Sequence, residues 1–295
     1  MPHARIKKQL FSVLKYLLLI CALLFFLFPI YWMLLTSLKK PGEISANPVI
    51  WFTTNITFDN FKLLFGYQGN FWGQKDYVGR SFMQNIAPFL LNSFAVGSIA
   101  TLLSIILGSN LAYSMANFDF GKQRFYSWLL SLRMIPPVVI SIPLFLIFRT
   151  FRLLDTWAAI IIAYMITNIP FATLILAGFF KDIPSEISDA ARIDGCTHLG
   201  AFYKVVIPLV APALVAVFVI SFLFNWNELL IAATLSTSEA SQTFPVYTAN
   251  FVQVERGTSW GIAAAGGVIG ILPVVIFSAY IQKYMLRGLS MGAIK

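Results

Sequence analysis

The sequence predicts an all-α integral membrane protein with six transmembrane helices and with both termini in the cytoplasm. Its composition predicts the class: 58% of the 295 residues are hydrophobic and only 11% are charged, whereas soluble domains are about 45–50% apolar and about 25% charged. Its segment lengths predict the number of helices, because six apolar segments approach the roughly 20 residues that cross a bilayer.

The first expected span runs from Leu17 to Leu35, after a basic N-terminus. A signal peptide has an apolar run of about 7–15 residues and a small-residue cleavage site. No such site follows this longer run, so we expect a retained span. The five other expected spans are Pro88–Ala112, Trp128–Phe148, Trp157–Gly178, Val206–Phe224 and Gly261–Ile281.

Lysine and arginine set the expected orientation, because they gather in short cytoplasmic loops. With the N-terminus inside, the short outer loops hold Arg149, Arg152 and Arg256, and Lys39 and Lys40 depart from the rule. The inner segments hold many more: Arg5, Lys7, Lys8, Lys15, Lys122, Arg124, Lys181, Arg192, Lys204, Lys283, Arg287 and Lys295. The net charge of +9 is therefore attributed to residues that flank spans. They form no patch with interleaved aromatics, so no nucleic-acid partner is expected.

These spans divide the chain into four parts. Residues 1–36 hold the N-terminus and first span, residues 37–86 form an extracytoplasmic segment, residues 87–285 form the core, and residues 286–295 form a cytoplasmic tail. The segment 37–86 is too polar to span and too aromatic to be disordered, so we expect short helices and turns. A smaller outer loop is expected from Asn227 to Trp260.

Several kinds of chemistry are disfavoured by what the sequence lacks. Cys21 and Cys196 lie in dissimilar surroundings, so neither a disulfide nor a metal site is expected. His3 and His198 are far apart, and His198 is expected at the surface. Neither GxxxxGK[ST] nor GxGxxG occurs, so no nucleotide site or cofactor is expected on this chain. Without clustered His, Asp or Glu at membrane depth, a membrane-embedded enzyme is disfavoured as well.

Proline and glycine mark three of the expected spans as candidates for a translocation path. Broken helices are tolerated in a membrane only where neighbours or a water-filled cavity satisfy the backbone. Ordinary kinking and close packing are the alternative explanation. The residues are Pro136, Pro137 and Pro143 in the third span, Asn168-Ile169-Pro170 in the fourth, and Gly266, Gly267, Gly270 and Pro273 in the sixth.

Polar residues inside spans give a second set of candidates. A charge within a span costs a few kcal/mol unless it reaches the interface, a cavity or a partner, which singles out Arg133. Asparagines could line a route for a hydroxyl-rich solute, or they could join helices by hydrogen bonds. The candidate path residues are Asn92, Asn110, Arg133, Asn168 and Asn225.

A compact charged stretch, SEISDAARIDGCTHLGAFYKVVIPLVAP from Ser185 to Pro212, separates the fourth and fifth expected spans. The pattern predicts an amphipathic helix with Ser185 as its N-cap. Glu186 and Asp189 lie in the first turns, where carboxylates favour the positive end of the helix dipole. The residues expected to share a face are Ile187, Ala190 and Ala191.

A second short helix is expected after a turn at Asp194-Gly195, where glycine accepts a positive φ. Thr197 can cap this helix, and the chain re-enters the membrane near Pro208. The residues expected to share its apolar face are Leu199, Phe202, Tyr203 and Val206. The two helices are interpreted as a cytoplasmic docking element for a protein. The alternative is a helix that lies among headgroups, which the carboxylates disfavour at an anionic leaflet.

The charged stretch resembles the EAA loop, EAA-x3-G-x9-I-x-L-P, of permease subunits in binding-protein-dependent ABC importers. The matching positions are Asp189 for the glutamate, Ala190 and Ala191 for the alanines, Gly195 for the glycine, and Val205, Ile207 and Pro208 for the I-x-L-P end. Aspartate is one methylene shorter than glutamate, so the family's carboxylate contact is in question at this position.

The resemblance extends over residues 89–295. It includes the stretches LLNSFAVGSIATLLSIILGSNLAYSMANFDF, RMIPPVVISIPLFLIFRTFRLLDT, FNWNELL, FPVYTANF, WGIAAAGGVIGILPVVI and QKYMLRGLSMGAIK. The chain is most similar to the second permease of carbohydrate importers of the maltose type. Within that group it resembles the second permease of a bacterial alginate importer.

The resemblance implies a type I ABC importer permease fold in the bacterial inner membrane. It implies a second permease that shares the translocation path for a carbohydrate, an oligo- or polysaccharide. It also implies two ATPase subunits that bind ATP and Mg²⁺, and an extracytoplasmic solute-binding protein. This chain would then not be an enzyme, and its loop 182–208 would hold the coupling helix.

The resemblance also assigns roles to residues. The coupling residues are Glu186, Ile187, Asp189, Ala190, Ala191, Asp194, Gly195, Phe202 and Pro208. The tail residues that reach the ATPase are Gly288, Gly292 and Lys295, and an unengaged tail is the alternative. The residues that meet the binding protein are Thr237, Ser238, Glu239, Ser241 and Gln242.

Two other transporter hypotheses remain open. A permease of this family could carry a solute that is not a sugar, although FNWNELL and RMIPP favour a carbohydrate. A self-sufficient secondary transporter would need inverted repeats or an ionisable residue at mid-span. Apart from Arg133, the sequence shows neither.

Overall fold

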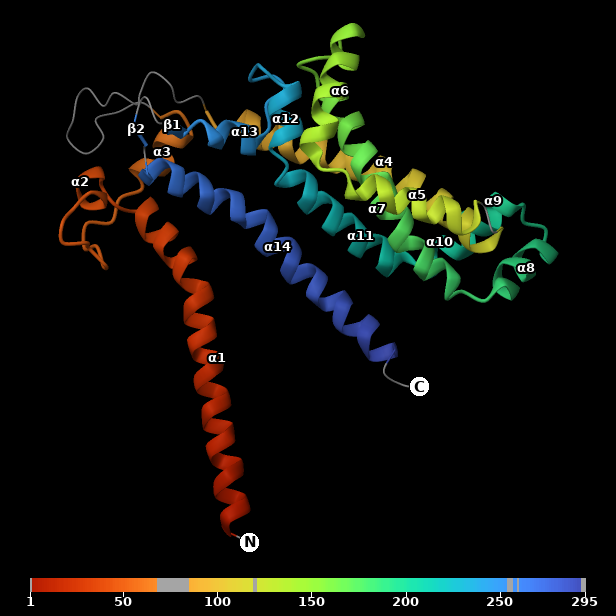
Figure 1. Cartoon of the computed structure of the whole chain (residues 1–295), viewed down its shortest axis with the longest axis horizontal. Helices are drawn as coiled ribbons and strands as arrows, with labels where there is room; N and C mark the ends of the chain where they lie inside the picture. Colours follow the sequence, from red (N-terminus) through yellow and green to blue (C-terminus); the bar gives the residue numbers. More distant parts are fainter. Residues whose placement is uncertain (1, 68–84, 119–120, 254–256, 259, 293–295) are drawn as a thin grey trace. The chain divides into compact units, whose positions relative to one another are not determined.

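A computed structural model describes residues 2–67, 85–118, 121–253, 257–258 and 260–292 (Figure 1). In these ranges four helices are long and apolar enough to cross a membrane, and the number rises to six if each of two bent helix pairs is one span. The four are Leu10–Ser37, Ala87–Asn117, Trp157–Lys181 and Trp260–Tyr280. The helical class is confirmed.

Two compact units make up the chain. The first comprises residues 1–85 and 250–271, and the second comprises residues 86–249 and 272–295. The long last helix, α14 (Trp260–Gly292), contributes to both.

The first unit holds α1 (Pro2–Ser37), α2 (Pro41–Ile44), α3 (Asp59–Leu64) and a strand pair, β1 (Val252–Gln253) and β2 (Gly257–Thr258). The strands are antiparallel. The buried Asn60 of α3 donates from Nδ2 to the carbonyls of Ser37 (2.8 Å) and Lys39 (3.0 Å), which ties α3 to the end of α1. The described part of residues 37–86 thus consists of short helices and turns, as predicted.

The second unit is built around α4 (Ala87–Asn117) and α7 (Trp157–Lys181). These helices approach closely at Gly108, where an added Cβ would lie 2.9 Å from the Ala172 Cβ. The helix α11 (Ala211–Trp226) packs against both. One buried cluster includes Tyr113 of α4, Leu176 of α7 and Phe202 of the segment between α7 and α11.

The predicted third span is broken into α5 (Lys122–Met134) and α6 (Pro137–Thr150), which meet at 90°. A residue before proline is disfavoured in the α conformation, and two prolines in a row impose this twice. Ile135 and Pro136 are accordingly extended, with ψ of 122° and 140°. The predicted break is therefore confirmed at Pro136-Pro137, whereas Pro143 lies inside α6.

The prediction that Asn168-Ile169-Pro170 interrupts the fourth span is wrong, because α7 is continuous through Pro170. One proline removes one backbone bond, and a membrane helix can satisfy the freed carbonyl locally. The sixth span is likewise one helix through Pro273. The expected fifth span, Val206–Phe224, contains a sharp bend, because His198–Leu209 meets α11 at 78°, with Val210 at the bend.

Candidate functional site

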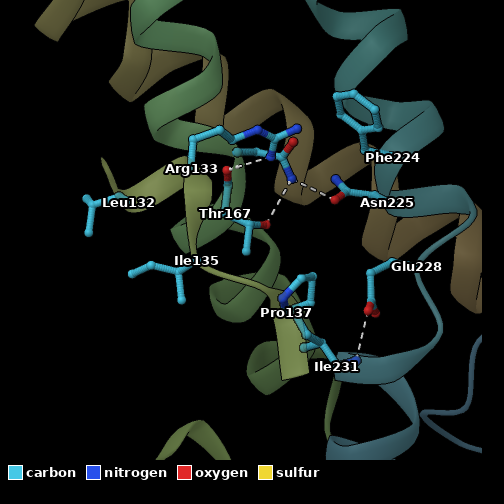
Figure 2. Close-up of a pocket in the computed structure, with 10 residues that line it drawn as sticks. Leu132, Arg133, Ile135, Pro137, Thr167, Phe224, Asn225, Glu228 and Ile231 are labelled. Atoms are coloured by element: carbon cyan, nitrogen blue, oxygen red, sulfur yellow. Dashed lines mark hydrogen bonds between the residues drawn. The ribbon is translucent and has the colours of Figure 1, made fainter. Parts of the chain in front are cut away.

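A cavity of about 370 Å³, lined by both apolar and polar side chains, opens at the break in the third span (Figure 2). Leu132, Arg133, Ile135 and Pro137 line it from the two sides of the break. The rest of the lining comes from α7, α11, the turn after α11 and the start of α12 (Leu230–Leu235): Thr167, Asn168, Phe224, Asn225, Glu228 and Ile231. Three of the five predicted path residues are therefore brought together.

Asn168 and Asn225 form the buried polar link in the cavity wall. Nδ2 of Asn168 donates to Oδ1 of Asn225 at 2.7 Å and to the carbonyl of Tyr164 at 2.8 Å. Nδ2 of Asn225 donates to Oγ1 of Thr101 at 3.0 Å. Both asparagines therefore join helices, as the alternative interpretation expected, and both also line the cavity.

Arg133 projects into the cavity from the end of α5. Its guanidinium carbon lies 5.0 Å from the ring centroid of Phe171 and 4.9 Å from that of Phe224. One guanidinium nitrogen donates to the Thr167 carbonyl, at a long 3.4 Å. The cation is thus held between two aromatic rings, an arrangement worth about 0.5–2 kcal/mol per contact.

Glu228 is a cavity residue that sequence reasoning missed, because it was placed in the outer loop. Its two carboxylate oxygens accept from the backbone N–H groups of Ile231 (2.8 Å) and Ala232 (3.0 Å). The carboxylate thereby caps the N-terminus of α12. Its position three residues after Asn225, just beyond the end of α11, was the available signal.

The other two predicted path residues, Asn92 and Asn110, lie outside the cavity lining. Nδ2 of Asn110 donates to the hydroxyl of Tyr203 at 3.0 Å, which joins α4 to the segment Phe202–Val206. Nδ2 of Asn92 donates to the carbonyls of Glu239 (3.0 Å) and Gln242 (2.9 Å). Both join parts of the chain by hydrogen bonds, as the alternative interpretation expected, and neither lines this cavity.

The segment 236–243, between α12 and α13 (Phe244–Ala249), is anchored by Asp155. Oδ1 of Asp155 accepts from the backbone N–H groups of Thr237 (2.8 Å) and Ser238 (2.9 Å), and from the Ser241 hydroxyl. Desolvation alone would raise the pKa of Asp155, but these hydrogen bonds lower it well below its ordinary value. Sequence reasoning missed this aspartate, whose φ of 62° is one that aspartate tolerates better than most residues.

The five residues predicted to meet a binding protein all lie in this anchored segment. Ser241 is buried, Gln242 is half-buried, and Thr237, Ser238 and Glu239 are exposed. Nε1 of Trp157 adds a further bond, donating to the Ala240 carbonyl at 3.0 Å. The segment therefore presents a short exposed surface on a fixed backbone.

The charged stretch begins with α8 (Ser185–Ile193), whose first residue is the one expected as the N-cap, so the helix begins one residue earlier than expected. Pro184 rather than Ser185 is the N-cap, so the predicted cap is wrong, since Ser185 already lies in the helix. Ala190 is exposed, whereas Ala191 is buried within the chain at 8% exposure. The two alanines therefore do not present one common surface.

The charged side chains of the stretch are accessible. Glu186, Asp189 and Asp194 are exposed, and Asp189 pairs with Arg192 at 3.3 Å. Ile187 is half-buried. Gly195 has a φ of +92° with open space where a Cβ would be, which confirms the predicted glycine turn.

The second helix is capped as predicted, because the Thr197 hydroxyl accepts from the Gly200 N–H at 3.1 Å. It comprises α9 (His198–Ala201), a π-helical segment η2 (Phe202–Val206) and α10 (Ile207–Leu209). The predicted common apolar face is wrong: Phe202 is 1% exposed, whereas Leu199 is 65% exposed. The wider π turn shifts the register that a 3.6-residue period assumes.

Phe202 links the charged stretch to the spans. Its ring centroid lies 4.6 Å from that of Tyr113 in α4 and 5.8 Å from that of Phe180 in α7. Pro208 is exposed at the start of the bend. Of the predicted tail residues, Gly288 and Gly292 lie in α14, and Lys295 lies outside the described residues.

Sequence comparison identifies relatives over most of the chain. It is 34% identical over 270 residues to the sulfoquinovosyl glycerol transport system permease protein of Agrobacterium fabrum, which covers 91% of this chain and 89% of the relative. It is 35% identical over 273 residues to the trehalose transport system permease protein of Mycobacterium tuberculosis, covering 91% and 92%.

The fold has a solved counterpart. A chain in the crystal structure of a bacterial ABC transporter involved in the import of the acidic polysaccharide alginate matches with a TM-score of 0.74 and 22% identity, over 94% of this chain and 96% of that chain. Residues 100–291 match the family described as binding-protein-dependent transport system inner membrane component. The chain therefore belongs to the family of inner membrane components of binding-protein-dependent transport systems.

Proposed function

We propose that this chain is a permease subunit of an ATP-driven ABC importer for a carbohydrate. The observation that carries the proposal is the similarity, over nine tenths of the chain, to permeases named for sulfoquinovosyl glycerol and trehalose. The cavity supports it, because amide and charged groups gather there at a break in a span. Broken spans line solute sites in other transporters.

The proposed topology has six spans, with α5 and α6 counted as one span and α11 as the fifth, and with both termini in the cytoplasm of a bacterial inner membrane. The charged stretch 182–208 then faces the cytoplasm, and the segment 236–243 faces outward. The excess of lysine and arginine in the inner segments supports this orientation.

The proposed assembly contains a second permease, two ATPase subunits and an extracytoplasmic solute-binding protein. ATP and Mg²⁺ are bound by the ATPase pair, so this chain supplies no catalytic residue. The helix α8 is the coupling helix, and the tail from Gly288 onward is a second ATPase contact. The anchored segment around Glu239 meets the binding protein.

Movement of α8 can reach the spans through packing. Phe202, buried between Tyr113 and Phe180, is in contact with the aromatic side chains of α4 and α7. An exposed pair such as Asp189–Arg192 contributes only about 0–1 kcal/mol. Coupling is therefore assigned to the fit of α8 and its packing rather than to this ion pair.

The test is affinity purification of the tagged chain from its native membrane with identification of the proteins that follow it. Wild type is compared with Gly195→Trp, which forces a side chain into a positive φ. Gly178→Trp is the matched control, since Gly178 also has open space but an ordinary φ.

The expected result is that wild type and the Gly178 variant bring down a second permease and a P-loop ATPase. The Gly195 variant should insert normally but lose the ATPase or its coupled activity. A chain that purifies without an ATPase, or a Gly195 variant that transports like wild type, would contradict the proposal.

A further inference from the structure

Arg133 is a cation whose charge no carboxylate compensates within the part of the chain that the structure describes. Among the residues that the structure describes, it forms no ion pair. Its one hydrogen bond, to the Thr167 carbonyl, is 3.4 Å long. A charge in a span is costly unless it faces a cavity or an opposite charge. Arg133 faces the cavity, and the remaining question is which anion meets it.

The one carboxylate in the cavity lining is already engaged. Both oxygens of Glu228 accept backbone N–H groups at the start of α12. Figure 2 shows Glu228 bonded to the Ile231 nitrogen on α12, while Arg133 enters the cavity from α5. In the cavity lining, the Glu228 carboxylate is therefore already hydrogen-bonded to the backbone, whereas the Arg133 guanidinium has no ion-pair partner among the described residues.

The guanidinium is also held in place. Phe171 and Phe224 lie about equally far from it, with centroid distances of 5.0 and 4.9 Å. Their rings are T-shaped to each other at 5.4 Å. A positioned guanidinium presents planar N–H groups that match the two oxygens of a carboxylate. Pre-positioning lowers the entropy cost of such a contact.

The same cavity wall holds a second polar group without a partner. The Oδ1 atom of Asn168 is buried and has no hydrogen-bond partner among the described residues. A buried acceptor without a donor costs free energy. Because Asn168 is only 1% exposed, a sugar hydroxyl would reach this oxygen only if the cavity wall shifts. At about 370 Å³ the cavity lies at the small end of ligand pockets.

From these observations we infer that the cavity is a subsite for an acidic sugar unit, with Arg133 pairing the carboxylate of the solute. The inference rests on the proposed function and narrows it to a class of carbohydrate. It assigns Arg133 a role in solute selection by this chain, separate from selection by a binding protein.

The test measures binding to the assembled membrane complex without its binding protein, so that only the membrane subunits select. The probes are a galacturonate trisaccharide and the same trisaccharide with each carboxylate reduced to a neutral alcohol. The variants are Arg133→Gln, Arg133→Lys and the control Arg149→Gln, an exposed arginine of α6 outside the cavity lining.

The expected result is that wild type and the Arg149 variant each bind the acidic probe at least about tenfold more tightly than the neutral probe. This corresponds to a difference in binding free energy of about 1.4 kcal/mol. Arg133→Gln should abolish this preference without weakening the neutral probe, and Arg133→Lys should retain part of it. A wild type without the preference, or one that binds neither probe, overturns the inference.

Two outcomes separate this inference from the proposed function. If Arg133→Gln dissociates the complex, the anion belongs to the second permease, and the inference fails while the importer assignment stands. If the preference survives in Arg133→Gln, the inference again fails alone. Failure to purify any ATPase with the chain would instead contradict the proposed function.

Discussion

Asp155 is predicted to hold the outer segment 236–243 in one conformation, and two substitutions separate its contributions. Asp155→Asn keeps an acceptor oxygen and tolerates the positive φ, but it removes the charge. Asp155→Gly also tolerates that φ, but it removes every side-chain hydrogen bond. The backbone bond from the Asp155 N–H to the Leu235 carbonyl, at 2.8 Å, can persist in both.

The magnitude follows from the bonds that are lost. Hydrogen bonds to charged groups contribute about 1.5–3 kcal/mol each, and neutral ones about 0.5–1.5 kcal/mol. Asp155 accepts three, from Thr237, Ser238 and Ser241. Allowing for partial exposure, the free energy of local opening should fall by about 1–2 kcal/mol in the Asn variant and by about 3 kcal/mol in the Gly variant.

Amide hydrogen exchange at Thr237 and Ser238 is the assay, because it reports local opening directly. Exchange should accelerate about tenfold or more for Asn and about 100-fold for Gly, since 1.4 kcal/mol is tenfold. Glu239→Gln removes an exposed charge from the same segment and should leave exchange unchanged. Unchanged exchange at both amides in the Gly variant would refute the anchoring role.

Two further predictions concern pH and packing. Because the pKa of Asp155 is lowered in the folded protein, its stabilisation is complete above the ordinary value of about 3.9 and is lost only as pH falls through the lowered one. Exchange in the segment, corrected for intrinsic rate, should therefore be equal at pH 7 and pH 5, and a loss of protection at pH 5 would contradict this. Phe202→Ala should lower the free energy of unfolding by about 3–5 kcal/mol, the usual cost for a buried phenylalanine. Thermal unfolding measures this loss beside that of the control Leu199→Ala, which removes an exposed neighbouring side chain and should lower the free energy of unfolding by less than about 1 kcal/mol. Equal losses in the two variants would contradict the buried packing of Phe202.

The break in the third span was predictable because its cause is local. Two adjacent prolines force consecutive extended residues, whatever surrounds them. Pro170 was misjudged because a single proline leaves only one backbone group to satisfy, and tertiary surroundings decide whether the helix continues. The glycine turn at Gly195 and the Thr197 cap are also local, and both are confirmed.

The candidate site was predictable only in part, because it depends on contacts between distant residues. Polarity within a span identified Arg133, Asn168 and Asn225 as candidates, but not which of the five polar residues would share a cavity. Asp155 was missed because its partners, in Thr237, Ser238 and Ser241, lie more than 80 residues along the chain. Glu228 was missed because its partners are backbone N–H groups. The π-helical turn at Phe202 likewise alters the helical period on which the predicted face depended.

The most direct test of the central claim is uptake of labelled carbohydrate into proteoliposomes that contain the complete complex. The account predicts uptake only when ATP is supplied to the ATPase side and the loaded binding protein to the other. Uptake should also be lost in Gly195→Trp, with the chain still inserted. Uptake by this chain alone, without ATP and driven by an ion gradient, would contradict the account and support a secondary transporter.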